Sequence, residues 1–361
     1  ACTVRAKVTI YKYKIDLANK TWNLDTAFGK GGKVIKSQSW SDSTTISKNN
    51  RKAAENSSLR TASAWCGRFL KRQLLDIKEF QLHAPIVAKK GSKAYNCLGK
   101  DTVALDTPFH VIFDANGKEK RVGFIKARKM YDGCTMTPKL EGEKKKGKKI
   151  VLKPMENEII LGGSKIRKGM TAWEMPSIGL NIGVTVGTSS VIGGPALGQL
   201  TIGVLSEYNL APYLNISEVH ASTNFRATFY GTDTAVELYK MFNAENPKAE
   251  GGLAGQAEVG VLKRHYMGPL MLDFGAYLIG SYYLLESYGD YDYGVKAFGV
   301  AGKAGIGWQI APRWIARFIA GYKFAVAMPT VTDSDGNDLG VDGEFGNEMG
   351  LEGTFDILYN W

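Results

Sequence analysis

The chain has 361 residues and a formal net charge of +11, which is unevenly distributed along it. Residues 1–170 hold 36 Lys and Arg against 15 Asp and Glu, a net of +21, which leaves 10 against 20, a net of −10, for residues 171–361. No run of 18 or more apolar residues occurs, so the sequence excludes a helical membrane span. We expect two domains, 1–170 and 171–361, of which the basic one contacts an acidic polymer, surface or protein; a solvated lysine-rich surface is the alternative.

The basic half begins with a strand and a helix. Residues 3–15 alternate apolar and polar side chains, which predicts an exposed strand. Leu70, Leu74 and Ile77 recur at helical spacing in a stretch without proline, so we expect one helix over 59–77.

All four cysteines lie in this half, and none has the C-x-x-C spacing of a metal or redox site. The chain begins at Ala1 rather than Met, which is typical of an exported protein after removal of a signal peptide. Export predicts disulfides in one of three pairings of Cys2, Cys66, Cys97 and Cys134. A lipid anchor on Cys2 is the weaker interpretation, because Ala1 precedes it.

An Asn-Gly turn signal marks a hairpin further along the basic half. Asn116-Gly117 lies between two apolar runs, which predicts strands at 110–113 and 121–125. The second part of this hairpin reads Gly117-Lys118, then Val122-Gly123-Phe124-Ile125. Over 94–132 the chain resembles a bacterial SH3-type small β-barrel, a resemblance that implies a module for binding cell-wall peptides or for packing against other domains.

A lysine tract follows the hairpin and consists of Lys144, Lys145, Lys146, Lys148 and Lys149, interrupted by Gly147. We expect it to hold an anionic partner, either peptidoglycan or an acidic envelope protein, and the alternative is a solvated loop. Export makes nucleic acid an unsuitable partner despite the charge.

From residue 176 onward glycine and aromatic residues increase, and apolar residues alternate strictly with polar ones. Leu180, Ile182, Val184 and Val186 begin the pattern, which predicts eight half-buried strands up to the C-terminal end. Short and long connections alternate between these strands. The short ones are 209–212, 267–269 and 311–313, and the long ones are 188–198, 232–252, 286–294 and 329–346. This order is typical of a membrane β-barrel with tight periplasmic turns and longer outer loops, and it predicts that residues 1–170 lie in the periplasm.

The last strand ends in alternating apolar residues, Phe355, Ile357, Tyr359 and Trp361. These residues resemble the C-terminal assembly signal of the small eight-stranded outer-membrane barrels, the family of OmpA-like and opacity-protein-like barrels, although Trp361 stands where Phe is usual. The resemblance implies a fold and an outer-membrane location. The predicted fold is therefore mainly β, with an eight-stranded antiparallel transmembrane β-barrel preceded by a mixed α/β periplasmic domain that includes an SH3-like part.

The inward face of the predicted strands carries four basic and four acidic side chains, Arg226, Glu258, Asp273, Lys303, Arg317, Lys323, Glu352 and Asp356. An eight-stranded barrel is just wide enough for side chains to fill, so we expect these charges to pair inside a plugged lumen. A narrow channel is the weaker interpretation. His220 and Ser222 also face inward, away from lipid, which disfavours a lipid-modifying enzyme.

The last long connection contains oxygen-bearing side chains at positions one, three, five and twelve of an EF-hand loop, Asp333, Asp335, Asn337 and Glu344. The sixth position is Asp338 where glycine is needed, and no helices flank the loop. Calcium binding and a solvated acidic loop both remain open, and the departures favour the loop. We expect no other cofactor.

Together these patterns predict a structural, non-enzymatic outer-membrane protein. It anchors a basic periplasmic module to the outer membrane and contacts peptidoglycan or a larger envelope assembly. The alternative is a surface adhesin or receptor that acts through long acidic outer loops.

Overall fold

The structure is a computed structural model of the whole chain. Its described residues are 2–10, 13–16, 21–24, 33–42, 51–75, 80–115, 117–131, 154–190, 199–233, 235–236, 249–287, 293–326, 330–332 and 348–361. The chain divides into two compact units, Ala1–Leu82 with Glu174–Ile178, and His83–Trp173 with Gly179–Trp361. No helix within the described ranges has the length and apolar character needed to cross a membrane.

The described residues of the first unit form two antiparallel strand pairs and one helix. Its elements are β1 (Cys2–Ile10) paired with β4 (Lys33–Asp42), β2 (Tyr13–Asp16) paired with β3 (Thr21–Leu24), and α1 (Arg51–Leu75), which packs on β1 and β4. The predicted helix is confirmed, but it begins at Arg51, eight residues before Leu59. This earlier start follows from good helix formers such as Ala53 and Ala54, which extend the helix although they add no apolar stripe.

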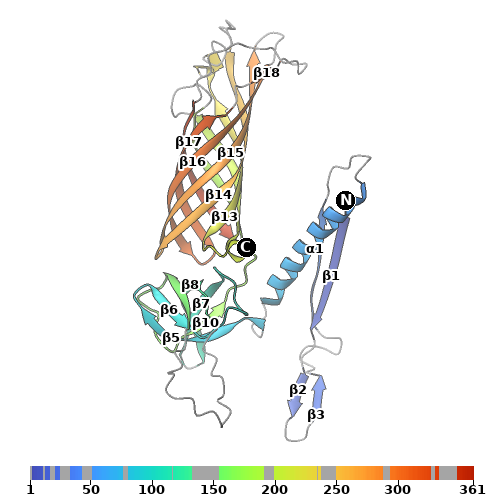
Figure 1. Cartoon of the computed structure of the whole chain (residues 1–361), viewed down its shortest axis with the longest axis vertical. Coiled ribbons are helices and arrows are strands. Elements are labelled where there is room, and N and C mark those ends of the chain that lie inside the picture. The colour runs from blue at the N-terminus through green and yellow to red at the C-terminus, as the bar shows by residue number, and fades with distance from the viewer. Residues whose placement is uncertain are drawn as a thin grey trace, which may run out of the picture. The chain divides into compact units, whose positions relative to one another are not determined.

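The second unit begins with a small closed barrel of six strands (Figure 1). In spatial order they are β10 (Thr171–Glu174), β5 (His83–Lys90), β6 (Lys93–Asn96), β9 (Met155–Leu161), β8 (Lys118–Lys129) and β7 (Pro108–Ala115). Ile86, Phe109, Val111, Phe124 and Ile125 are at most 1% exposed and form its core. The stretch 94–132 contributes β6, β7 and β8 to this barrel, and its SH3-type character stays a prediction.

The predicted hairpin of the small barrel is confirmed. β7 pairs with β8 up to Ala115 opposite Lys118. Gly117 has φ +77°, a left-handed conformation that favours glycine, and its N–H donates to Asp114 Oδ1 at 2.9 Å.

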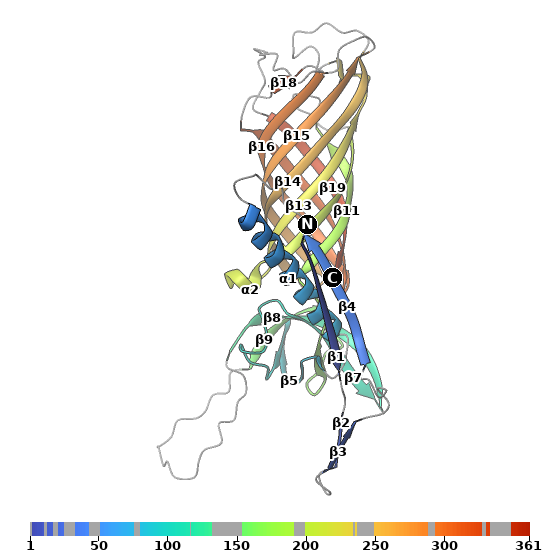
Figure 2. The ribbon, with the colours of Figure 1, turned by 90° about the vertical axis from the view of Figure 1, so that its right-hand side faces the viewer.

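The rest of the second unit is a larger antiparallel barrel of eight strands (Figures 1 and 2). The strands are β11 (Leu180–Ser189), β12 (Gln199–Asn209), β13 (Val219–Tyr230), β14 (Ala249–Met267), β15 (Leu270–Ser287), β16 (Tyr293–Ala311), β17 (Trp314–Ala325) and β19 (Glu348–Asn360). Each of these strands pairs with the next one in this order. The first strand, β11, also pairs with the last, β19, with Val184 opposite Ile357, and this pairing closes the ring. A short strand, β18 (Thr330–Thr332), adds to β16 beyond the ring. The predicted eight-stranded barrel is confirmed.

Of the three connections predicted to be short in the large barrel, one differs from the prediction. Two-residue turns at 268–269 and 312–313 agree with it. The β12–β13 connection, predicted as 209–212, instead runs over 210–218 and includes α2 (Ala211–Leu214). Pro212 suits the first turn of a helix, and Asn215 ends it in the left-handed conformation at φ 54°, so the chain does not reverse at once.

Candidate functional site

Among the described residues, ten charged side chains, five acidic and five basic, lie on the inward face of the large barrel in two clusters. The inner cluster, nearer the two-residue turns, consists of Glu207, Arg264, Asp273, Arg317 and Asp356. Arg264 lies 3.2 Å from Glu207 and 2.9 Å from Asp273. Arg317 pairs with Glu207, lies 2.8 Å from Asp273 and donates from Nε to Asp356 at 2.8 Å. Each acid therefore contacts at least one guanidinium, which offsets the cost of burying it.

The outer cluster lies further along the same lumen and consists of Arg226, Glu258, Lys303, Lys323 and Glu352. Arg226 pairs with Glu258 and lies 2.9 Å from Glu352. Lys303 Nζ lies 2.6 Å from Glu258 and 2.5 Å from Glu352, so two cations bracket two carboxylates. Lys323 Nζ donates to Ser189 Oγ at 2.5 Å and lies 4.0 Å from Glu352. The structure thus brings all eight predicted lumen charges into these two clusters.

The two charged residues that the sequence reasoning missed are Glu207 and Arg264. Both are at most 1% exposed, and both belong to the inner cluster. Their strand phase could have revealed them. Leu200, Ile202 and Val204 face outward, so Glu207 faces inward, and the outward phase of Val261 likewise turns Arg264 inward.

A third cluster joins the small barrel to the end of the large barrel that carries the two-residue turns. Glu218, the residue before β13, accepts from Lys126 Nζ and from Arg128 Nη1, each at 2.8 Å. Arg128 also pairs with Asp106 and donates from Nε to Glu158 at 2.7 Å. We call Asp106, Lys126, Arg128, Glu158 and Glu218 the junction cluster.

Neighbouring groups complete the junction cluster. The backbone N–H of Glu218 donates to Asp106, and the N–H of Arg264 donates to the Glu218 carbonyl at 2.9 Å. His220 Nε2 lies 3.2 Å from the Glu218 carboxylate. Lys126 Nζ lies 4.8 Å from the centre of the Tyr266 ring, at cation–π distance. The two barrels are therefore held by backbone and side-chain contacts together.

The charges of the junction cluster depend on one another. Burial works against ionisation of Glu218, but Lys126 and Arg128 outweigh it and hold the pKa of Glu218 well below its usual range. Burial of Asp106 and the nearby Glu218 carboxylate raise the pKa of Asp106, and they outweigh the effect of Arg128. Glu218 therefore stays ionised more readily than Asp106.

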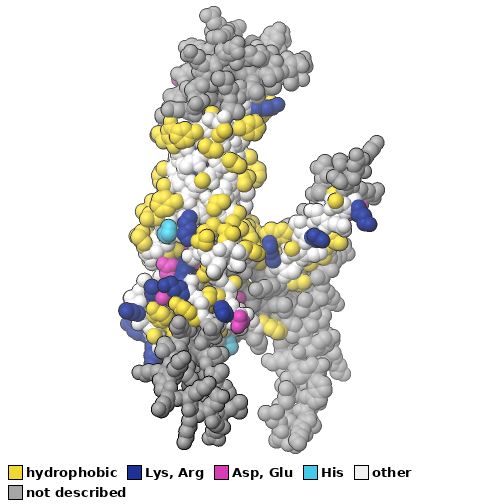
Figure 3. Space-filling view, in the orientation of Figure 1, with side chains coloured by type: hydrophobic (Ala, Val, Ile, Leu, Met, Phe, Trp, Pro, Cys, Tyr) yellow, Lys and Arg dark blue, Asp and Glu magenta, His cyan; other side chains and the backbone are white. Residues whose placement is uncertain are grey.

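The outward face of the large barrel is apolar and exposed. In Figure 3 hydrophobic side chains lie in patches on the side of the large barrel that faces the viewer, with other side chains and backbone between them. The side chains of the outward face include Phe225 at 59%, Leu278 at 67% and Phe298 at 63% exposure, while Thr354 of the opposite strand phase is 4% exposed. An apolar exterior around a charged interior is the reverse of a soluble barrel and suits a lipid bilayer. The large barrel therefore has the side-chain arrangement of a transmembrane β-barrel.

Solved structures of small outer-membrane barrels resemble this chain over half of its length. Neisserial surface protein A is 10% identical with a TM-score of 0.33, and the match covers 50% of this chain and 96% of that one. The N-terminal β-barrel domain of Pseudomonas aeruginosa OprF is 8% identical with a TM-score of 0.29, covering 50% and 97%. Ail, the attachment invasion locus protein of Yersinia pestis, is 11% identical with a TM-score of 0.31, covering 50% and 96%. No family model and no curated protein matches the sequence.

Several predicted sites fall outside the described residues. They are the lysine tract Lys144, Lys145, Lys146, Lys148 and Lys149, the acidic loop residues Asp333, Asp335, Asn337 and Glu344, and the side chains of Cys2 and Cys134. Calcium binding and the disulfide pairing accordingly stay predictions. Among the described residues, no three His, Cys, Asp or Glu side chains are grouped as a metal site. Phe355, Ile357 and Trp361 of the predicted assembly signal face outward on or just beyond β19.

Proposed function

We propose that this protein is a structural anchor of the outer membrane, with no enzymatic role. The large barrel fixes the chain in the bilayer, and the small barrel is held against its short-turn end on the periplasmic side. There the basic half contacts peptidoglycan or an acidic envelope protein.

The junction cluster is the observation that carries this proposal. A flexibly tethered module needs no buried ion pairs with its anchor, and desolvating such charges is costly unless both partners are held in place. Lys126 and Glu218 have side chains only 12% and 3% exposed, and Arg128 contacts both Glu158 of its own barrel and Glu218 of the other. This geometry suits an anchor that sets the orientation of the small barrel.

The charge of residues 1–170 supports the class of partner. A net of +21 attracts an anionic polymer or an acidic protein surface, and the contact must weaken as salt shortens the Debye length from about 10 Å at 0.1 M to about 3 Å at 1 M. We expect the full chain in a nonionic detergent to co-sediment with peptidoglycan at low salt and to be released at high salt.

Two matched sets of substitutions test which lysines hold the partner. The first set replaces the lysine tract with glutamine at Lys144, Lys145, Lys146, Lys148 and Lys149. The control set makes the same change at exposed lysines of the small barrel, Lys90, Lys118, Lys120, Lys165 and Lys168. Loss of sedimentation in the first set alone supports the tract as the contact. If sedimentation with peptidoglycan is unchanged by salt and by both sets of lysine substitutions, the electrostatic part of the proposal is overturned.

A surface adhesin or receptor is the second candidate, and the strand lengths favour it. β14, β15 and β16 have 19, 18 and 19 residues, whereas about 9–11 residues suffice to cross a bilayer. These strands therefore extend past the membrane on the long-loop side and present that end to the outside. Binding of intact cells to host or matrix proteins that depends on residues 231–248 would favour this role over the anchor.

A further inference from the structure

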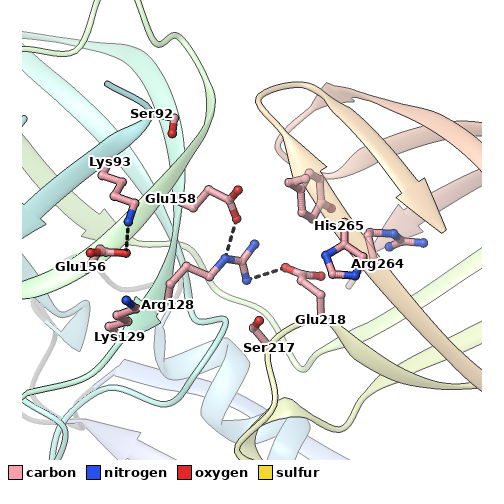
Figure 4. A pocket seen from close by; sticks show the side chains of 11 residues that line it. Ser92, Lys93, Arg128, Lys129, Glu156, Glu158, Ser217, Glu218, Arg264 and His265 are labelled. Atoms are coloured by element: carbon pink, nitrogen blue, oxygen red, sulfur yellow. Dashed lines mark hydrogen bonds and ion pairs between the residues drawn. The ribbon is translucent and has the colours of Figure 1, made fainter. Parts of the chain in front are cut away.

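A polar cavity lies beside the junction cluster, between the two barrels (Figure 4). Its volume is about 300 Å³. The small barrel contributes Ser92, Lys93, Arg128, Lys129, Glu156 and Glu158, and the large barrel contributes Ser217, Glu218, Arg264, His265 and Tyr266. The cavity is large enough for a small polar group.

The acids that line the cavity already have cationic partners. Glu156 lies 2.9 Å from Lys93, and Figure 4 shows Glu158 and Glu218 joined to the same arginine, Arg128. None of the carboxylate oxygens of these three residues is among the buried atoms that lack a hydrogen-bond partner in the described part of the chain. The cavity therefore has little capacity left to bind a cation.

Among the hydrogen-bond donors that line the cavity, in contrast to the acids, some lack a partner. Arg128 Nη2 is buried and has no hydrogen-bond partner among the described residues, although Nε and Nη1 of the same guanidinium are engaged. The guanidinium of Arg264, in contrast, is held in the inner cluster by Asp273 and Glu207. Lys129 is exposed at the rim and has no ion-pair partner within the described ranges. An unpaired buried donor is costly, so the free Arg128 Nη2 at this cavity points to an acceptor that is absent from the protein itself.

We propose that this cavity binds a small oxyanion, a carboxylate or phosphate group, at Arg128, with Lys129 at the entrance. Four cations and three acids line the cavity, so an anion leaves the lining close to neutral. Planar guanidiniums bind such groups through charge-assisted hydrogen bonds, which are stronger than bonds to neutral acceptors. The source of the group is either a free anion or the headgroup of a neighbouring lipid.

Binding of inorganic phosphate to the full chain in a nonionic detergent tests this site. We expect saturable binding of one phosphate per chain by calorimetry at constant ionic strength. Arg128→Lys keeps the charge of the junction cluster but removes the free Nη2, and we expect it to weaken binding about tenfold, the loss typical of one charge-assisted hydrogen bond. Lys129→Gln lies outside the junction cluster and should weaken binding about threefold while the thermal unfolding curve stays unchanged.

The matched control is Lys168→Gln, which makes the same charge change at an exposed lysine of the small barrel away from the cavity. It should bind phosphate as the wild type does. Absence of saturable binding, or equal weakening by Lys129→Gln and Lys168→Gln, would overturn the proposal.

A second experiment, in lipid vesicles, identifies the source of the oxyanion. The protein is placed in phosphatidylglycerol vesicles and in phosphatidylcholine vesicles, and phosphate binding is compared. Weaker phosphate binding in phosphatidylglycerol alone assigns the site to an anionic lipid headgroup. Equal binding in both vesicles assigns it to a free anion.

Discussion

Arg128 of the small barrel and Glu218 of the large barrel form an ion pair, with 2.8 Å between Nη1 and Oε1. Their side chains are 11% and 3% exposed, so water screens this pair poorly. The pair joins β8 to the residue that precedes β13, which makes the orientation of one barrel depend on the other.

Loss of the Glu218 charge should loosen the junction. Glu218→Gln keeps the size of the side chain but leaves Lys126 and Arg128 buried without their shared carboxylate. We expect the free energy of unfolding of the small barrel to fall by about 3 kcal/mol, as measured by hydrogen exchange of β8 and β9 in detergent. The control Glu156→Gln breaks a pair whose lysine is 45% exposed and should cost less than about 1 kcal/mol. Equal effects of the two substitutions would contradict the role assigned to the junction cluster.

The small barrel should lose stability as the pH falls below neutrality. Burial, followed by the charges of Arg121 and Arg313, lowers the pKa of His110 to about 4. The unfolded value is about 6.5, so the stability that neutral His110 contributes is complete above pH 6.5 and is lost as the pH falls toward 4. We expect His110→Phe to flatten the dependence of unfolding free energy on pH in this window, measured by urea titration. Identical slopes for variant and wild type would mean that His110 does not titrate as inferred.

The direction of side chains in the large barrel could be predicted from the sequence, because successive residues of a strand point to opposite faces. The strict alternation of residues 180–186 places Val184 and Val186 on one face of the strand, and they are 57% and 45% exposed on the outside of the barrel. The same rule would have placed Glu207 and Arg264 inside, had it been followed to the ends of β12 and β14. Local patterns thus account for the barrel and its lumen.

The junction cluster could not be predicted in this way. Glu218 and Asp106 are 112 residues apart, and Glu218 lies in a connection that the sequence indicated as a shorter turn. No periodicity links a loop of one barrel to a loop of another, because their contact depends on how the two closed barrels pack.

Charge on the lipid-facing side should destabilise the large barrel. Phe318 of β17 is 52% exposed in a strand that crosses the membrane, and Phe318→Arg should lower the free energy of unfolding by about 2–4 kcal/mol if the residue lies at the bilayer midplane. Thr354→Ser removes one buried methyl group on the inward face of β19 and should lower it by only about 0.5–1.5 kcal/mol. Equilibrium unfolding in lipid vesicles measures both, and tolerance of arginine at residue 318 would argue against the strand phase.

The large barrel should not conduct ions. The inner and outer clusters place ten paired charges across the lumen of an eight-stranded barrel, whose interior is just wide enough for side chains. We expect purified protein in planar bilayers to give no discrete conductance steps at high salt. Stable, porin-like steps would show that the clusters leave an open path.

Trypsin added to intact cells tests most directly whether the small barrel lies inside the cell envelope, at the short-turn end of the membrane barrel. Lys240 and Lys248 lie in the long connection between β13 and β14, whereas Lys144 and Lys149 belong to the small-barrel half. We predict cleavage at residues 240 or 248 in intact cells, with cleavage between 144 and 149 only after the outer membrane is permeabilised. Cleavage between 144 and 149 in intact cells would place the small barrel outside and contradict the account.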